Sequence, residues 1–389
     1  MKYERSGEME NNNDKNKNKK KGVGKKIALT AVFFVICFAG GIAMGKLIQP
    51  NAAADTVTRT SGEKLEFALT AMVSMFVSYI LTLIIHEGGH LVFGLATGYK
   101  FLSFRVFSLT LVKKDGKFAW KRFSIQGTGG QCILMPPEDT APEKAPFLFY
   151  HLGGGLFNFI TAAICLPLVK VISAGIPKTA LAVLGVFSAV QGLLNLIPMK
   201  IQVPNDGYNI LMMIRNPADR AAIYKSLYLN GLLYRGMSPR EIPAEYYDFG
   251  ESGFYKTVSK VLSAGAVLDS HDYETAEKLF AECAEDNSIP VYNLESRTEL
   301  MFCKVMNGAP AEEIDALFDK ELQNYIKAAG KTMISKRRQM YAYQLIFKHD
   351  AAAAEKEYEA AMKMKETYPI EGELKSELGL IEAVRERAQ

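Results

Sequence analysis

A run of apolar residues that is long enough to cross a lipid bilayer carries two histidines and a glutamate. Between Leu65 and about Tyr99 the only charged side chains are Glu66 and Glu87, and about twenty apolar helical residues span the hydrocarbon core. Residues 86–90 read His-Glu-Gly-Gly-His, an HExxH string. In a helix, residues four apart share one face, so both imidazoles can reach one metal ion. We therefore expect a metal-binding helix that lies inside a membrane.

The apolar residues are concentrated in the first half of the chain, whereas the second half has an ordinary charged composition. This asymmetry predicts a mainly α protein, in which a polytopic membrane helix bundle of about four spans precedes a C-terminal helical soluble domain. The net charge is only +4, and basic residues cluster between Lys15 and Lys26. Such an arm is typical of a signal for membrane orientation, so no nucleic-acid partner is expected.

Four apolar segments are predicted to cross the membrane. The basic arm, residues 1–26, is expected to stay in the cytoplasm by the positive-inside rule, ahead of an N-terminal anchor at 27–45. A cleaved signal peptide is the alternative interpretation of that first segment. The other predicted spans are 65–90, 145–172 and 179–196. This order brings the HExxH string and the C-terminal domain to the cytoplasmic side.

The segment between the second and third spans has a strand-like pattern. From Phe101 to Leu134, runs of Phe, Val, Leu and Thr are broken at residues 114–117, Lys-Asp-Gly-Lys. This break predicts a β-hairpin turn, and the basic residues around it agree with a cytoplasmic position. One interpretation of the glycine-rich stretch 127–130 is a simple turn.

Asp206 is the predicted third metal ligand, because it follows the fourth span closely. Two imidazoles and one carboxylate leave the fourth position of Zn²⁺ open for a water, whose pKa falls from about 15.7 toward 7 when bound. Glu87 is expected to accept the proton of that water as a general base, which suits hydrolysis of a peptide bond. Gly88 and Gly89 each cost roughly 1 kcal/mol relative to Ala in a helix. They predict that another segment approaches this helix closely.

From about Leu65 to Asn209 the chain resembles the site-2 protease family of intramembrane zinc metalloproteases. Residues 86–90 look like the first metal motif of that family, and Asp206-Gly207 resembles the second. Residues 154–158, Gly-Gly-Leu-Phe-Asn, are similar to a Gly-Pro-x-x-Asn element, with Gly in place of the usual Pro.

The resemblance also implies roles for residues outside the metal ligands. It places Asn158 near the metal, where it helps to hold substrate or the developing oxyanion, although an Asn in a membrane helix also serves simply to bond a neighbouring helix. It implies that Gly129 and Gly130 lie on a strand that pairs with an unwound substrate segment. His151 is interpreted as an interfacial or packing histidine.

The region 216–389 has no further spanning run. Within it, His271-Asp272 begins a pattern of the form His-Asp-x-x-x-Ala-Glu-Lys-x-aromatic, and His349-Asp350 begins a second copy. The spacing fits helix-pair repeats, and the region resembles tetratricopeptide-like arrays that bind a protein partner. An irregular helical bundle is the alternative.

Together these features predict a zinc endopeptidase that cuts membrane-anchored proteins in or near their transmembrane segments. Its metalloprotease core is expected at 65–215, in a bacterial cell membrane. A non-proteolytic membrane scaffold, whose C-terminal domain binds partners, is the main alternative. A membrane di-iron oxygenase would need more histidines than the five present.

Overall fold

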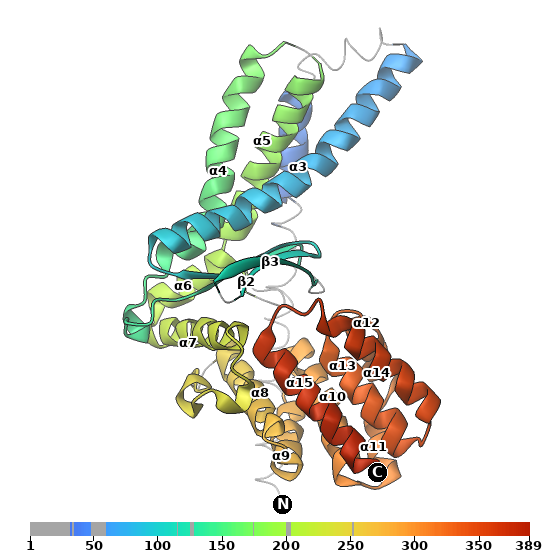
Figure 1. Ribbon diagram of the computed structural model, residues 1–389. Coiled ribbons are helices and arrows are strands. Elements are labelled where there is room, and N and C mark those ends of the chain that lie inside the picture. The colour runs from blue at the N-terminus through green and yellow to red at the C-terminus, as the bar shows by residue number, and fades with distance from the viewer. Residues whose placement is uncertain are drawn as a thin grey trace, which may run out of the picture. The chain divides into compact units, whose positions relative to one another are not determined.

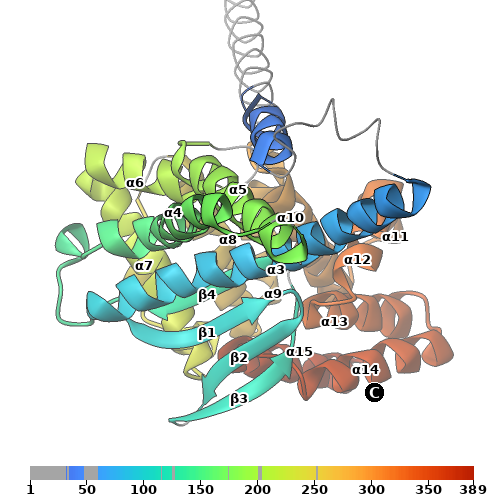
Figure 2. The ribbon, with the colours of Figure 1, turned by 90° about the horizontal axis from the view of Figure 1, so that it is seen from above.

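The computed structural model describes most of the chain, namely residues 32, 35–47, 60–114, 116–124, 128–173, 175–199, 204–250 and 253–389. The protein is mainly helical and contains a small antiparallel sheet (Figures 1 and 2). Its contacts define two units, the first made of residues 1–90 and 151–211 and the second of residues 91–150 and 212–389. The bounds of the two units are defined by contacts between residues. The predicted domain bounds come from composition along the chain, so the two sets of bounds are not equivalent.

Three helices among the described residues are long and apolar enough to cross a membrane. They are α3 (Ser61–Ala96), α4 (Leu148–Val171, preceded by the short η1, Pro142–Lys144) and α5 (Ile176–Leu196). Each coincides with a predicted span, and α5 begins three residues before the predicted position 179. A shorter apolar helix, Val35–Leu47, covers part of the predicted anchor. Apart from Val32, the rest of that anchor and the basic arm lie outside the described residues.

Four strands form the sheet of the second unit, in the order β3-β2-β1-β4 with every neighbouring pair antiparallel. They are β1 (Lys100–Val106), β2 (Leu109–Lys114), β3 (Lys117–Arg122) and β4 (Gly130–Met135). The predicted hairpin is confirmed, because Lys114 pairs with Lys117 across a two-residue connection. Gly116 in that connection has a φ of 79°, which glycine adopts without a steric penalty.

Helices make up the rest of the second unit, and their packed side chains form its main core together with residues of the sheet. The helices are α6 (Asp206–Arg215, shared with the first unit), α7 (Pro217–Tyr234), η2 (Pro239–Glu241), η3 (Ala244–Tyr246), α8 (Gly253–Asp269), α9 (Tyr273–Glu285), α10 (Pro290–Asn307), α11 (Ala311–Leu317), α12 (Lys320–Ala329), α13 (Ile334–Ala342), the π-helical turn η4 (Tyr343–Phe347), α14 (Ala351–Lys365) and α15 (Glu371–Arg387).

The two copies of the His-Asp pattern adopt the same local structure. His271 and His349 both have left-handed backbone angles, with φ of 65° and 53°. Asp272 then caps α9 by accepting a hydrogen bond from the backbone N–H of the residue three positions on, and Asp350 caps α14 in the same way. The repeated sequence therefore encodes a repeated turn into a helix.

Candidate metal centre

Both histidines of the HExxH string lie on one face of helix α3, within the first unit. His86 and His90 are buried, and their Nε2 atoms lie 3.2 Å apart. Glu87, also buried, is the next residue along the helix after His86. The spacing of four residues produces this convergence, because one helical turn brings the two side chains over the same surface.

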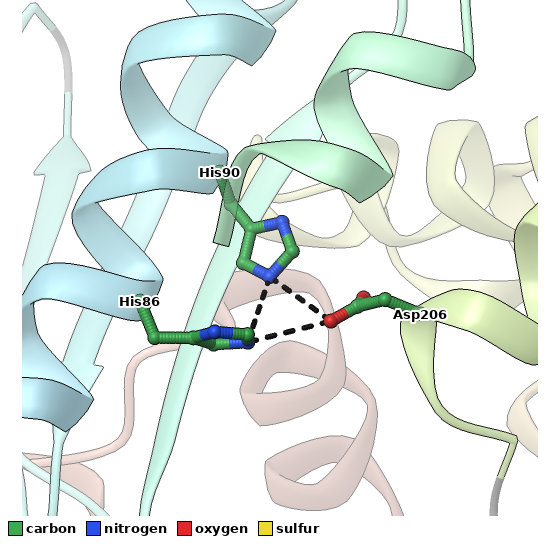
Figure 3. A group of neighbouring side chains, drawn as sticks. All are labelled: His86, His90 and Asp206. Atoms are coloured by element: carbon green, nitrogen blue, oxygen red, sulfur yellow. Dashed lines mark hydrogen bonds and ion pairs between the residues drawn. The ribbon is translucent and has the colours of Figure 1, made fainter. Parts of the chain in front are cut away.

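Asp206 meets the two histidines from the first turn of α6. Its Oδ2 atom lies 3.3 Å from Nε2 of His86 and 3.4 Å from Nε2 of His90 (Figure 3). One ligand atom from each of the three side chains lies within 4.8 Å of the other two. Two imidazole nitrogens and one carboxylate oxygen are a donor set that zinc accepts, with a fourth position left for water or substrate. The residues present therefore fit a zinc ion with one open coordination position.

The turn before α6 is built by Asn205, which positions Asp206. The Asn205 amide donates to the carbonyl oxygens of Leu194 and Ile197, both at 2.8 Å. Its Oδ1 accepts from the backbone N–H of Tyr208 at 2.9 Å, which caps the new helix. The end of α5 and the start of α6 are thereby tied together.

A glycine contact lets α4 approach α3 beside the two histidines. A Cβ atom on Gly89 would clash with the backbone of Gly153, and one on Gly153 would clash with the backbone of Gly89. A Cβ on Gly154 would lie 2.5 Å from Cε1 of His86 and 2.6 Å from Nε2 of His90. The predicted close approach is therefore confirmed at Gly89 but is wrong for Gly88, where the added atom would meet nothing within 4 Å.

Gly155 occupies the position at which the resemblance places proline. A Cβ atom there would lie 2.6 Å from Cγ of Leu196, at the end of α5. The absence of a side chain thus lets α4 pack against α5, which leads directly to the turn that carries Asp206.

Asn158 lies on the same helix and contacts one of the two histidines. It is fully buried, and its Nδ2 atom is 3.1 Å from Nδ1 of His86. A metal held by Nε2 of His86 requires the hydrogen to be on Nδ1, which must then find an acceptor. Among the described residues, Oδ1 of Asn158 is buried without a hydrogen-bond partner. Half a turn of the carboxamide exchanges its two ends and pairs that oxygen with the Nδ1–H group.

His151 is a site residue that the sequence interpretation missed. It is buried on α4, and its Nδ1 atom lies 3.9 Å from Oδ1 of Asp206, the oxygen that does not face the other two histidines. This separation is within ion-pair range but too long for a direct hydrogen bond. The spacing from His151 to Asn158 is seven residues, two helical turns, and this placement on one helix face was the available signal.

The surroundings of Asp206 favour its ionised form. Burial acts to raise the pKa of this carboxyl group, but the charge of His90 and the close approach of the imidazoles of His151, His86 and His90 outweigh it and hold the pKa well below its ordinary value. A carboxylate, the form that binds a metal, is therefore the stable state.

Gly129 and Gly130 lie in the second unit, where they lead into β4. The carbonyl oxygen of Gly129 accepts a hydrogen bond from the N–H of Phe107 at 2.7 Å, and Gly130 pairs with Val106 of β1. Strand β4 stands at the end of the strand order and has β1 as its partner in the sheet. One edge of β4 is therefore not paired within this sheet.

No protein-family model, curated protein or solved structure matches the chain. The assignment of a function therefore depends on the geometry of the site and on the motif resemblance.

Proposed function

We propose that the protein is an intramembrane zinc endopeptidase of the site-2 protease type. The observation that carries this proposal is the convergence of His86, His90 and Asp206 on helices next to a buried glutamate. Two of these ligands and Glu87 lie on α3, a helix apolar enough to cross a membrane. A charged side chain at the centre of the bilayer costs roughly 3 kcal/mol on insertion scales, and metal coordination offsets that cost.

Each residue of the proposed site has its own role in peptide hydrolysis. His86, His90 and Asp206 would hold zinc, which when bound acidifies a water and polarises a carbonyl group. The Glu87 carboxylate accepts the proton of the attacking water and delivers it to the leaving amine. Asn158 and His151 support the ligands from α4, on the evidence of their contacts with His86 and Asp206.

The substrate is proposed to be a membrane-anchored protein, cut in or near its transmembrane segment on the cytoplasmic side of a bacterial membrane. Its unwound backbone would pair with the edge of β4 at Gly129 and Gly130, because an unpaired strand edge offers N–H and C=O groups to an extended chain.

The C-terminal helices are proposed to select or regulate substrates as a tetratricopeptide-like array. The equivalent turns at His271 and His349, each followed by a capping aspartate, favour a repeated helical unit. A scaffold without protease activity would use the same surface, so the test must address the chemistry itself.

Glu87→Gln separates these functions, because it removes the base while keeping every metal ligand. We expect the variant to retain zinc at the native stoichiometry and to lose cleavage by at least about 100-fold. The measurement compares membrane-protein fragments and their new termini in cells that carry either form. Glu66→Gln is the matched control, since Glu66 is exposed on the same helix. Equal fragment profiles for all three proteins would favour the scaffold.

A further inference from the structure

The β2–β3 hairpin has two faces of different character. Cross-strand partners point to the same face of a sheet, and the pairs Leu109–Arg122, Leu111–Trp120 and Lys113–Phe118 therefore share one face. The alternate pairs lie on the other face. There, Val112 is buried and Ala119 packs against the main core of the second unit.

The first face exposes large apolar side chains at the end of the sheet. Leu109 is 51% exposed, Phe118 63% and Trp120 64%. Strand β3, which carries the two aromatic residues, is the last in the strand order. Exposed aromatic residues that gather on an edge strand are typical of a surface that contacts a partner.

The sequence of the hairpin matches a membrane surface in charge as well as in apolar character. Two basic side chains, Lys113 and Arg122, share this face with the exposed apolar residues. The other face carries Lys114, which pairs with Glu371, and Lys121, which donates to the carbonyl oxygen of Glu366. Trp and Lys or Arg together are typical of the bilayer interface, where the ring enters the headgroup layer and the cation attracts anionic lipid.

Chain connectivity keeps the sheet near the end of α3. Helix α3 ends at Ala96 and β1 begins at Lys100, so the two ends are separated by at most about 14 Å. The chain carries no charged side chain between His90 and Tyr99, so no charge keeps this end of the helix out of the bilayer. The sheet is therefore within reach of the headgroups.

We propose that the face formed by Leu109, Phe118 and Trp120 docks into the headgroup region of an anionic lipid bilayer. The inference requires that the apolar helices cross the membrane, but it requires neither the metal nor protease activity. The hairpin is thus a second membrane contact, which holds the sheet against the bilayer surface.

The native chain provides its own probe, since Trp120 is its single tryptophan. We would reconstitute the full chain in vesicles of phosphatidylcholine and phosphatidylglycerol in equal parts. Lipids brominated on the upper acyl chain should quench Trp120 emission about twofold, and acrylamide in the water should quench it weakly. Phe118→Asp should reduce the quenching by brominated lipid, because a charge opposes insertion.

A matched control moves the tryptophan within the same unit. In the variant that combines Trp120→Phe with Glu282→Trp, the probe is at an exposed position of α9. Figure 1 shows α9 at the end of the second unit away from β2 and β3. This control should be quenched by acrylamide and not by brominated lipid.

Two results would overturn the proposal. Full acrylamide quenching of Trp120 without lipid quenching would place the hairpin in water. Protection from both quenchers would show that a protein surface covers it. Neither result bears on cleavage, so the failure of this inference and the failure of the protease function are distinguishable.

Discussion

Substitution of Asn158 tests the metal centre through one hydrogen bond. The amide lies 3.1 Å from Nδ1 of His86 and is fully buried. In the metal-bound tautomer it must act as an acceptor, so Asn158→Leu removes the partner of the Nδ1–H group. Asn158→Asp keeps an acceptor at the same position with nearly the same shape. The two variants therefore separate hydrogen-bond acceptance from simple packing.

The expected magnitude follows from the burial of this contact. Leaving one buried donor unsatisfied costs about 1 to 3 kcal/mol, and loss of such an outer partner weakens metal binding by about 10- to 100-fold. These figures agree, since a 10- to 100-fold change in Kd corresponds to about 1.4 to 2.7 kcal/mol. Asn158→Leu should raise the zinc Kd by this factor, and Asn158→Asp should leave it within about threefold.

The assay is competition for zinc between the detergent-solubilised protein and a coloured chelator. Thr161→Val is the matched control, because Thr161 lies one turn further along α4 and its hydroxyl bonds the carbonyl oxygen of Phe157 at 2.9 Å. That variant should bind zinc as the native chain does. An equal zinc Kd for Asn158→Leu and the native chain would refute the orienting role. If Asn158 only donates to an oxyanion, Asn158→Asp would keep zinc but lose turnover.

Two further predictions concern packing and pH. Gly88→Ala should stabilise the protein by about 1 kcal/mol, because the added methyl group meets no other atom within 4 Å. Gly89→Ala should lower both the unfolding temperature and the zinc content, because its methyl group forces α3 and α4 apart. Equal behaviour of the two variants would contradict the close contact between α3 and α4. Burial raises the pKa of Glu373 from 4.5 to about 7, against the hydrogen bond donated by Tyr368. Between these pH values the folded state binds more protons than the unfolded state, so the free energy of unfolding should fall as pH rises from 4.5 to about 7, by at most roughly 3 kcal/mol. Hydrogen exchange of α15 should report this slope, and its persistence in Glu373→Gln would exclude Glu373 as the source.

Local patterns explain which parts of the fold were predictable. The apolar runs predicted α3, α4 and α5, with helix ends within six residues of the predicted spans, since a helix that is apolar on most sides needs no information from distant residues. The Lys-Asp-Gly-Lys segment predicted the hairpin, because a two-residue connection with glycine matches the twist of the paired strands. The repeated His-Asp pattern encodes the same local turn twice, a left-handed histidine followed by a capping aspartate, whereas the helix-pair repeat stays a prediction.

The predicted ligands come together for two different reasons. His86 and His90 converge by helix periodicity alone, so their sequence spacing is sufficient. Asp206 joins them only because Asn205 ties the start of α6 to the end of α5. Its position after the fourth span suggested the contact, but the distance depends on packing.

The sequence by itself determined the apolar helices, the hairpin and the pair of histidines, because each follows from residues near one another in the chain. Only the tertiary structure decided which glycine faces α4, since Gly88 and Gly89 are equivalent by composition and differ only in the direction they face. It also decided that His151 lies beside Asp206 and that Asn158 contacts His86. These contacts join segments that are more than fifty residues apart, and such pairings depend on how whole helices pack.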